Sequence, residues 1–137
     1  MKIYFAGSIR GSEADREVYF AVIENLKKYG EVLTEHVGSK TISGLGEKNL
    51  SDKEIYNRDL KWLKLAEVVV ADVSTPSLGV GYELAKAEEL KKKILCIYKL
   101  EQGKLLSAMI SGNDNFTCKE YKNLLEAIKI IEEFVKQ

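Results

Sequence analysis

The sequence predicts an α/β protein with a flavodoxin-like (Rossmann-like) open, mostly parallel five-stranded sheet and helices on both faces. Short apolar runs alternate with longer helical patterns along its 137 residues. The most apolar run, residues 68–73, suits a parallel strand buried on both faces. Loops rich in glycine and serine follow two strands, as at the ligand sites of such sheets. We therefore expect a single α/β domain over residues 1–137.

The elements follow one another in strict alternation. The predicted strands are residues 2–6, 31–34, 68–73, 93–98 and 115–121, the last at an edge. The predicted helices are residues 12–29, 51–65, a helix that follows the loop at 74–81 and ends near 92, a short one within 105–110, and 124–135. Ser12 and Ser51 are expected N-caps, and Gly30 is an expected stop. Residues 36–49 are rich in glycine and polar side chains and are predicted to be a mobile functional loop.

Composition excludes several classes of function. Lysine plus arginine and aspartate plus glutamate each total 21, so the net charge of zero predicts no binding to a nucleic-acid polymer or an anionic membrane. Neither a signal peptide nor a membrane-spanning run is recognisable. Cys96 and Cys118 lack the spacing of a zinc or redox site and are expected to be buried thiols. These features favour a cytoplasmic protein without a metal.

If the strand order is 2-1-3-4-5, the loops after the first and third strands meet at the ligand-binding edge of the sheet. Residues 7–11, Gly-Ser-Ile-Arg-Gly, offer a hydroxyl, a guanidinium and backbone amides, which suit a phosphate group. They match neither the P-loop nor the dinucleotide fingerprint, and a plain strand-to-helix turn is the alternative. Residues 74–81 add further hydroxyl and amide donors.

Three further side chains have both a functional and an ordinary interpretation. Glu83 follows the second loop, where a carboxylate in a first helical turn would also offset the helix dipole. Asp59 lies in a helix, where a solvated surface charge is the usual explanation, and Tyr4 lies in a strand, where core packing is. His36, the single histidine, is expected to be exposed, so a Ser-His-Asp triad is rejected.

Five stretches in chain order resemble the 2'-deoxynucleoside 5'-phosphate N-hydrolases, which belong to the nucleoside 2'-deoxyribosyltransferase superfamily. They are residues 4–11 (YFAGSIRG), 32–37 (VLTEHV), 59–63 (DLKWL), 76–84 (PSLGVGYEL) and 106–110 (LSAMI). The resemblance fades beyond Gly112, so it gives the last strand and helix no role. It implies cleavage of a deoxynucleotide N-glycosidic bond to free base and 2-deoxyribose 5-phosphate, without a cofactor.

The resemblance also implies roles for single residues. Glu83 would be the nucleophile that forms a glycosyl-enzyme ester, Asp59 the acid/base group, and Tyr4 a sugar-side residue that orients Glu83. The implied phosphate and sugar ligands are Gly7, Ser8, Ile9, Arg10, Gly11, Ser77, Gly79, Met109 and, from the neighbouring subunit of a homodimer, Ser107.

Three other functions stay open at this point. Deoxyribosyl transfer to a second base is possible within the superfamily, although the serines and Arg10 favour monophosphates over nucleosides. A ribonucleotide N-hydrolase is possible because no single residue excludes a 2'-hydroxyl. A nucleotide-binding module without turnover would use the same loops, but it would gain little from Glu83 and Asp59.

Overall fold

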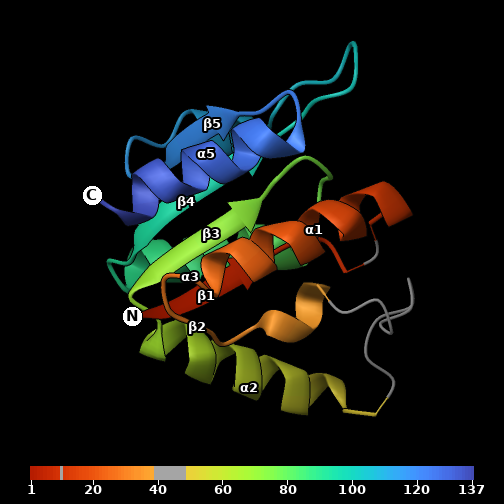
Figure 1. Ribbon diagram of the computed structural model, residues 1–137. Coiled ribbons are helices and arrows are strands. Elements are labelled where there is room, and N and C mark those ends of the chain that lie inside the picture. Colours follow the sequence, from red (N-terminus) through yellow and green to blue (C-terminus); the bar gives the residue numbers. More distant parts are fainter. Residues whose placement is uncertain (10, 39–48) are drawn as a thin grey trace.

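The computed structural model describes residues 1–9, 11–38 and 49–137. Five parallel strands form one sheet in the order β2-β1-β3-β4-β5, which confirms the predicted fold class and strand order (Figure 1). The strands are β1 (Lys2–Ala6), β2 (Glu31–Val32), β3 (Val68–Asp72), β4 (Lys93–Tyr98) and β5 (Thr117–Glu120). The order reverses between β1 and β3, so the loops that leave these two strands emerge side by side.

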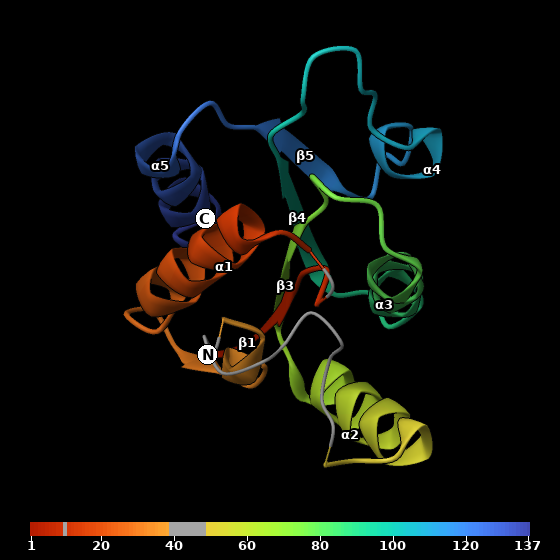
Figure 2. The same cartoon turned by 90° about the vertical axis from the view of Figure 1, so that its right-hand side faces the viewer.

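Helices cover both faces of the sheet. They are α1 (Glu13–Leu26), η1 (Glu35–Gly38), α2 (Asp52–Leu65), α3 (Leu78–Glu89), α4 (Ala108–Ser111) and α5 (Leu124–Val135). Figure 2 shows α1 and α5 on one face and α2 and α3 on the other, with the sheet between them. No helix in the described part of the chain is long and apolar enough to cross a membrane.

Strand alternation divides the core into two layers. Ile3 and Phe5 of β1 pack with α1 and α5, whereas Tyr4 and Ala6 pack with α2 and α3. Successive side chains of a strand point to opposite faces, so the position of Tyr4 in β1 directs its ring toward α2 and α3. The predicted aromatic packing of Tyr4 is therefore only part of its role, because its ring reaches the face where Asp59 and Glu83 lie.

Helices α1, α2 and α3 each begin directly after a serine that caps them. Ser12 caps α1 in a capping box with Asp15, and Ser51 caps α2, both as predicted. Ser77 caps α3, which begins at Leu78 and includes Gly79 and Gly81. The expected first-turn position of Glu83 is therefore wrong: it lies in the second turn of α3, where compensation of the helix dipole is weak.

The second strand and the first helix end earlier than expected, as does α3, which ends at Glu89 rather than near residue 92. The second strand stops at Val32, because the Thr34 hydroxyl accepts a hydrogen bond from the Phe5 amide at 2.7 Å and donates one to the Phe5 carbonyl at 2.8 Å. A side chain thus occupies the backbone groups that a longer β2 would use. The first helix ends at Leu26, and Gly30 then passes so close to Met1 that a Cβ would lie 2.2 Å from the Met1 carbonyl oxygen.

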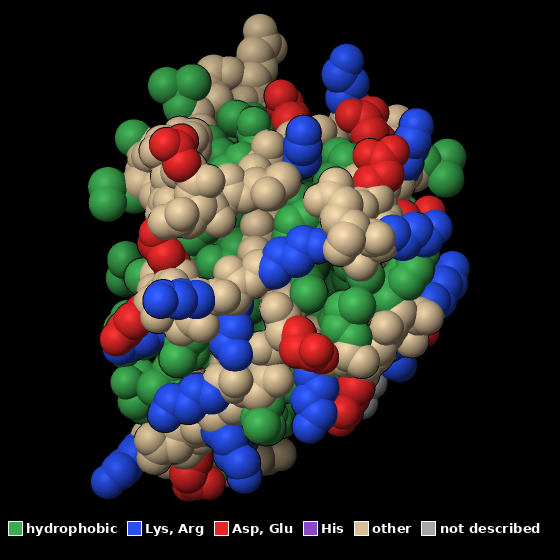
Figure 3. All heavy atoms as spheres, turned by 90° about the vertical axis from the view of Figure 1, so that its left-hand side faces the viewer, with side chains coloured by type: hydrophobic (Ala, Val, Ile, Leu, Met, Phe, Trp, Pro, Cys, Tyr) green, Lys and Arg blue, Asp and Glu red, His purple; other side chains and the backbone are tan. Residues whose placement is uncertain are grey.

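The amino ends of the strands lie on the side of the molecule shown in Figure 3. Lysine and arginine side chains lie among aspartate and glutamate over this face, so no field of one sign forms there. This distribution agrees with the zero net charge and gives a polyanion no extended surface on that side. The loop predicted at residues 36–49 begins instead as η1, and residues 39–48 lie outside the described residues.

Candidate active site

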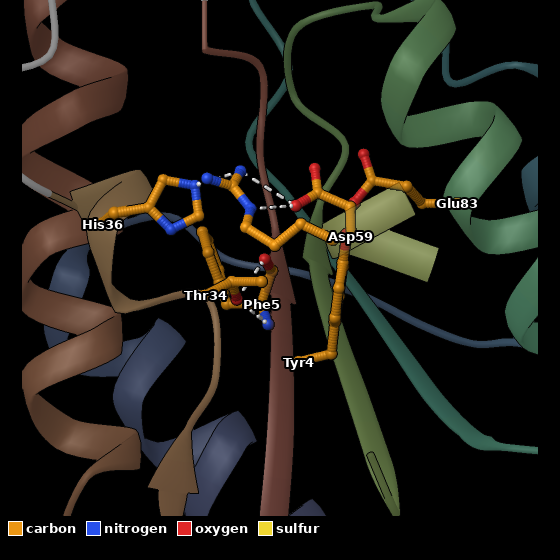
Figure 4. A network of polar contacts seen from close by, with 7 residues as sticks. Tyr4, Phe5, Thr34, His36, Asp59 and Glu83 are labelled. Carbon is orange, nitrogen blue, oxygen red and sulfur yellow. Dashed lines mark hydrogen bonds and ion pairs between the residues drawn. The ribbon is translucent and has the colours of Figure 1, made fainter. Parts of the chain in front are cut away.

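Two helices and one strand bring the three predicted catalytic side chains into one cavity. Tyr4 comes from β1, Asp59 from the middle of α2 and Glu83 from α3, and the cavity has a volume of about 260 Å³. Figure 4 shows the two carboxyl groups beside each other above the Tyr4 ring. The remaining lining residues are Asp52, Ile55, Tyr56, Leu60, Leu63, Gly79 and Tyr82. The aliphatic and aromatic walls, with the carboxylates of Asp59 and Glu83 among them, have the character of a cavity that suits an organic ligand with a polar end.

Tyr4 and Glu83 are joined by a short hydrogen bond, in which the Tyr4 hydroxyl donates to Glu83 Oε2. Burial raises the pKa of Tyr4 far above its usual range, and the negative charges of Glu83 and Asp59 raise it further. The hydroxyl therefore stays protonated and holds one carboxylate oxygen in place. The other oxygen, Oε1, lies beside Gly79, where a Cβ would be 3.8 Å away, so it faces the wall of the cavity that lacks a side chain.

Glu83 has the environment of a group that titrates near neutrality. Burial raises its pKa to about 7, because the ionised carboxylate loses the stabilisation of water. The hydrogen bond from Tyr4 lowers this pKa, and the negative charge of Asp59 raises it. Glu83 therefore gains and loses its proton near neutral pH, next to the negative charge of Asp59.

Arg58, the residue before Asp59, forms an ion pair with it. Arg58 Nε and Nη2 each lie 2.9 Å from Asp59 Oδ1, and the guanidinium lies over the Trp62 ring at 4.7 Å. The same Nη2 lies 3.3 Å from His36 Nε2 (Figure 4). The positive charge of Arg58 therefore lies directly beside the Asp59 carboxylate.

Two interpretations from the sequence need correction here. Asp59 is not a solvated surface charge, because it is partly buried in the cavity wall beside Arg58. His36 is not simply exposed either, because it lies in η1, half-buried, with its ring 5.6 Å from the Trp62 ring. The sequence alone gave Arg58 no role at the site, since only the fold shows that its guanidinium turns back toward Asp59.

The candidate phosphate ligands of the first loop lie where β1 ends. Gly7, Ser8 and Gly11 are buried and Ile9 is half-buried, while Arg10 lies outside the described residues. The Ser8 amide donates to the Tyr19 hydroxyl at 3.1 Å and the Gly11 amide donates to the Ser8 carbonyl at 3.0 Å. These two backbone amides therefore already have partners within the protein.

The second loop supplies Ser77, whose Oγ accepts a hydrogen bond from the Val80 amide at 3.3 Å at the start of α3. Ser77 thus lies at the start of α3, in the segment that follows β3, and β3 pairs with β1 in the sheet. Ser107 and Met109 lie elsewhere in the chain. Ser107 caps α4, Met109 is 81% exposed, and neither lines the cavity. Within a single chain the structure does not bring these two residues to the site.

Residues 1–9, 11–38 and 49–137 contain no cluster of three or more histidine, cysteine, aspartate or glutamate side chains that could hold a metal ion. The two cysteines, Cys96 in β4 and Cys118 in β5, are both free thiols. Cys96 is buried as predicted, and Cys118 is half-buried. The ionisable side chains that line the cavity are three carboxylic acids, Asp52, Asp59 and Glu83, and three phenols, Tyr4, Tyr56 and Tyr82.

Residues 3–124 match the family model described as "Nucleoside 2-deoxyribosyltransferase". The chain belongs to this family. Two relatives, both named 5-hydroxymethyl-dUMP N-hydrolase, are 46% identical: the one from Esox lucius over 99% of this chain and 97% of its own length, and the one from Danio rerio over 98% and 95%. These matches confirm the resemblance that the five sequence stretches indicated. The expectation that the resemblance fades beyond Gly112 is wrong, because both relatives align over nearly the whole chain.

Among solved structures, the CMP N-glycosidase BcmB from Clostridium botulinum is similar to this member of the nucleoside 2-deoxyribosyltransferase family. It aligns with a TM-score of 0.67 at 15% identity and covers 96% of this chain and 99% of its own. At this identity the likeness supports the shared fold alone. The cavity of this family member lies between α2 and α3, on the face of the sheet toward which Tyr4 of β1 points.

Proposed function

We propose that this protein hydrolyses the N-glycosidic bond of 2'-deoxynucleoside 5'-monophosphates, giving a free base and 2-deoxyribose 5-phosphate. The observation that supports this most strongly is the convergence of Tyr4, Asp59 and Glu83 in one apolar cavity. Cleavage of such a bond passes through an oxocarbenium-like state, which a nearby carboxylate stabilises. The names of the 46% identical relatives support the same reaction class.

In the proposed first step Glu83 Oε1 attacks C1' of the sugar, the C1'–N bond breaks, and Asp59 gives its proton to the departing base. In the second step water attacks C1', Asp59 accepts a proton from that water, and the ester to Glu83 breaks. The Tyr4 hydroxyl, which donates to Oε2, leaves Oε1 for the attack. Before the first step a proton must move from Glu83 to Asp59, which ionises the nucleophile and protonates the acid.

The loops after β1 and β3 support a monophosphate over a nucleoside. In this proposal Ser8, Arg10 and Ser77 bind the 5'-phosphate, with Gly7, Ile9 and Gly11 shaping the first loop and Gly79 leaving room for the sugar. The base then occupies the part of the cavity between Ile55, Leu60 and Tyr82. A transferase would need to hold a second base at this place after the first has left.

The decisive experiment incubates the purified protein with each deoxynucleoside monophosphate, with and without an excess of a second free base, and separates the products. Free base plus 2-deoxyribose 5-phosphate is the expected result. A new nucleotide that contains the added base would make the protein a transferase. Equal cleavage of ribonucleotides would broaden the substrate class, and no product from any nucleotide would favour the binding module.

The pH dependence of this reaction has a defined sign. The active form needs one proton on the pair of carboxyl groups, and that proton is lost as the pH rises through the Glu83 pKa of about 7. We therefore expect kcat/KM to fall about tenfold per pH unit well above pH 7. The substrate phosphate gains its second negative charge near pH 6, so its ionisation does not account for a fall in kcat/KM above pH 7. A rate that instead rises steadily through pH 7 to 9 would mean that no proton is delivered to the base.

We also propose that a homodimer completes the site, with Ser107 and Met109 supplied by the neighbouring subunit. Leu105 is 92% exposed and Met109 81% exposed, as expected for side chains that a second chain covers. Glu83→Gln and Ser107→Ala chains, each weakly active alone, should regain about one quarter of the unsubstituted activity when mixed at equal amounts, because half of the random dimers contain one intact site. Additive activities after mixing would contradict shared sites.

A further inference from the structure

The loops after β1 and β3 are tied together by one side-chain hydrogen bond. Thr75 Oγ1 donates to Asp15 Oδ2 at 2.7 Å, across 60 positions of sequence. Thr75 lies two residues before Ser77, and Asp15 lies in the first turn of α1, directly after the loop of residues 7–11. The bond therefore joins the two segments that flank the proposed phosphate site.

On the α1 side, the carboxylate of Asp15 is held rigidly. Oδ2 also accepts from the Ser12 amide at 3.1 Å, and the Asp15 amide donates to Ser12 Oγ at 3.1 Å. A Cβ at Gly11 would lie 2.9 Å from Oδ2, so glycine at this position permits the close approach of the loop to the carboxylate. The link thus starts from a fixed point at the beginning of a helix.

On the β3 side, the segment before Thr75 is anchored to the core. The Ser74 amide donates to Asp72 Oδ1 at 2.9 Å, and Ser74 Oγ accepts from the Lys99 amide at 2.8 Å. Asp72 is buried and accepts a second hydrogen bond, at 2.8 Å, from the Tyr121 hydroxyl. Both ends of the Asp15–Thr75 bond are therefore attached to ordered structure, so the bond fixes the distance between the two loops.

The negative charge of Asp15 would repel a phosphate bound between the two loops, unless nearby groups offset that charge. The Ser12 amide and the Thr75 hydroxyl point their positive ends at Asp15 and reduce this repulsion. Loss of the hydroxyl would remove one of these donors as well as the tie. Both effects would act on the binding of the phosphate and leave C1' untouched.

We propose that Asp15 and Thr75 are positioning residues that hold the two phosphate-binding loops at the separation a 5'-phosphate requires. This inference rests on the proposed function, which places the 5'-phosphate between the two loops. It assigns neither residue a contact with the substrate. It adds a determinant of phosphate affinity that is separate from the carboxylates at C1'.

The test uses Thr75→Val, which keeps the shape of the side chain and removes the hydroxyl, with Thr75→Ser as rescue and the exposed Thr117→Val as control. Binding of 2-deoxyribose 5-phosphate is measured by calorimetry, and KM and kcat are measured with a deoxynucleoside monophosphate. For Thr75→Val we expect Kd and KM to rise about 5- to 10-fold while kcat stays within about twofold. Thr75→Ser and Thr117→Val should match the unsubstituted protein.

Unchanged Kd and KM in Thr75→Val would overturn the inference, as would a parallel loss of kcat and thermal stability with unchanged Kd. The proposed function fails in a different way: the unsubstituted protein then cleaves no monophosphate. The calorimetric comparison still decides the inference in that case. Sugar phosphate that binds less tightly to Thr75→Val supports the link, and equal affinity or no binding to either protein refutes it.

Discussion

Glu83→Gln is expected to lower kcat by about 10³-fold or more while the Kd for a deoxynucleoside monophosphate changes by less than about threefold. The amide keeps the shape of the side chain and can still accept the hydrogen bond from Tyr4, but it is a far weaker nucleophile. Glu83 also stabilises positive charge at C1', so the substitution removes both contributions. Single-turnover kinetics combined with equilibrium titration would separate the two constants.

Glu89→Gln is the matched control, because Glu89 is exposed at the end of the same helix and forms only a 3.1 Å surface ion pair with Lys86. It should behave as the unsubstituted protein. A Glu83→Gln variant within tenfold of normal kcat would exclude Glu83 as nucleophile. Acid quenching of the unsubstituted protein during turnover, followed by peptide mass analysis, should locate the sugar phosphate on the peptide that contains Glu83.

Asp59→Asn should lower kcat by about 10²- to 10³-fold and should also reverse the pH dependence. The variant cannot give a proton to the base, so the loss of activity above pH 7 disappears. Removal of the Asp59 charge also lowers the pKa of Glu83, because that charge raises it in the unsubstituted protein. The remaining activity needs only ionised Glu83, so it should rise with pH and level off below pH 7.

A pH–rate profile of the two proteins measures this directly, with Asp114→Asn, an exposed loop carboxylate, as the control. The fall in kcat should be steepest for substrates whose bases are poor leaving groups, since these depend most on the proton. An Asp59→Asn variant that keeps the alkaline decline would show that another group supplies the proton. Arg58 and its contact with His36 would then be the next residues to substitute.

Much of the fold could be predicted because its signals are local. The apolar run at residues 68–73, the serine caps of α1 and α2, and the alternation of short and long patterns each act within a few residues. The start of α3 was harder, since Gly79 and Gly81 suggested a longer loop. Packing of Val80 and Leu84 against the sheet, with the Ser77 cap, outweighs the low helix propensity of the two glycines.

The site could be predicted only in part, since its contacts join residues that are distant in sequence. The glycine- and serine-rich loops marked the switch point, and the family resemblance pointed to Glu83, Asp59 and Tyr4. Tertiary contacts such as the Thr75–Asp15 hydrogen bond, and the direction of the Arg58 side chain toward its own neighbour, leave no pattern in the sequence. Nothing in the composition indicates a role for Ser107, because its proposed role requires a second chain.

The partly buried carboxylate of Glu83 in the cavity wall also sets a limit on the stability of the protein. The pKa of Glu83 is about 7 in the folded chain and 4.5 in the absence of burial, so the folded state binds this proton more tightly than the unfolded state does. The favourable contribution is complete below pH 4.5 and is lost as the pH rises through 7, a difference of about 3 kcal/mol. The ionised Glu83 side chain therefore destabilises the folded state. We expect variants with a neutral side chain at position 83 to lose turnover and to resist unfolding better in alkaline solution.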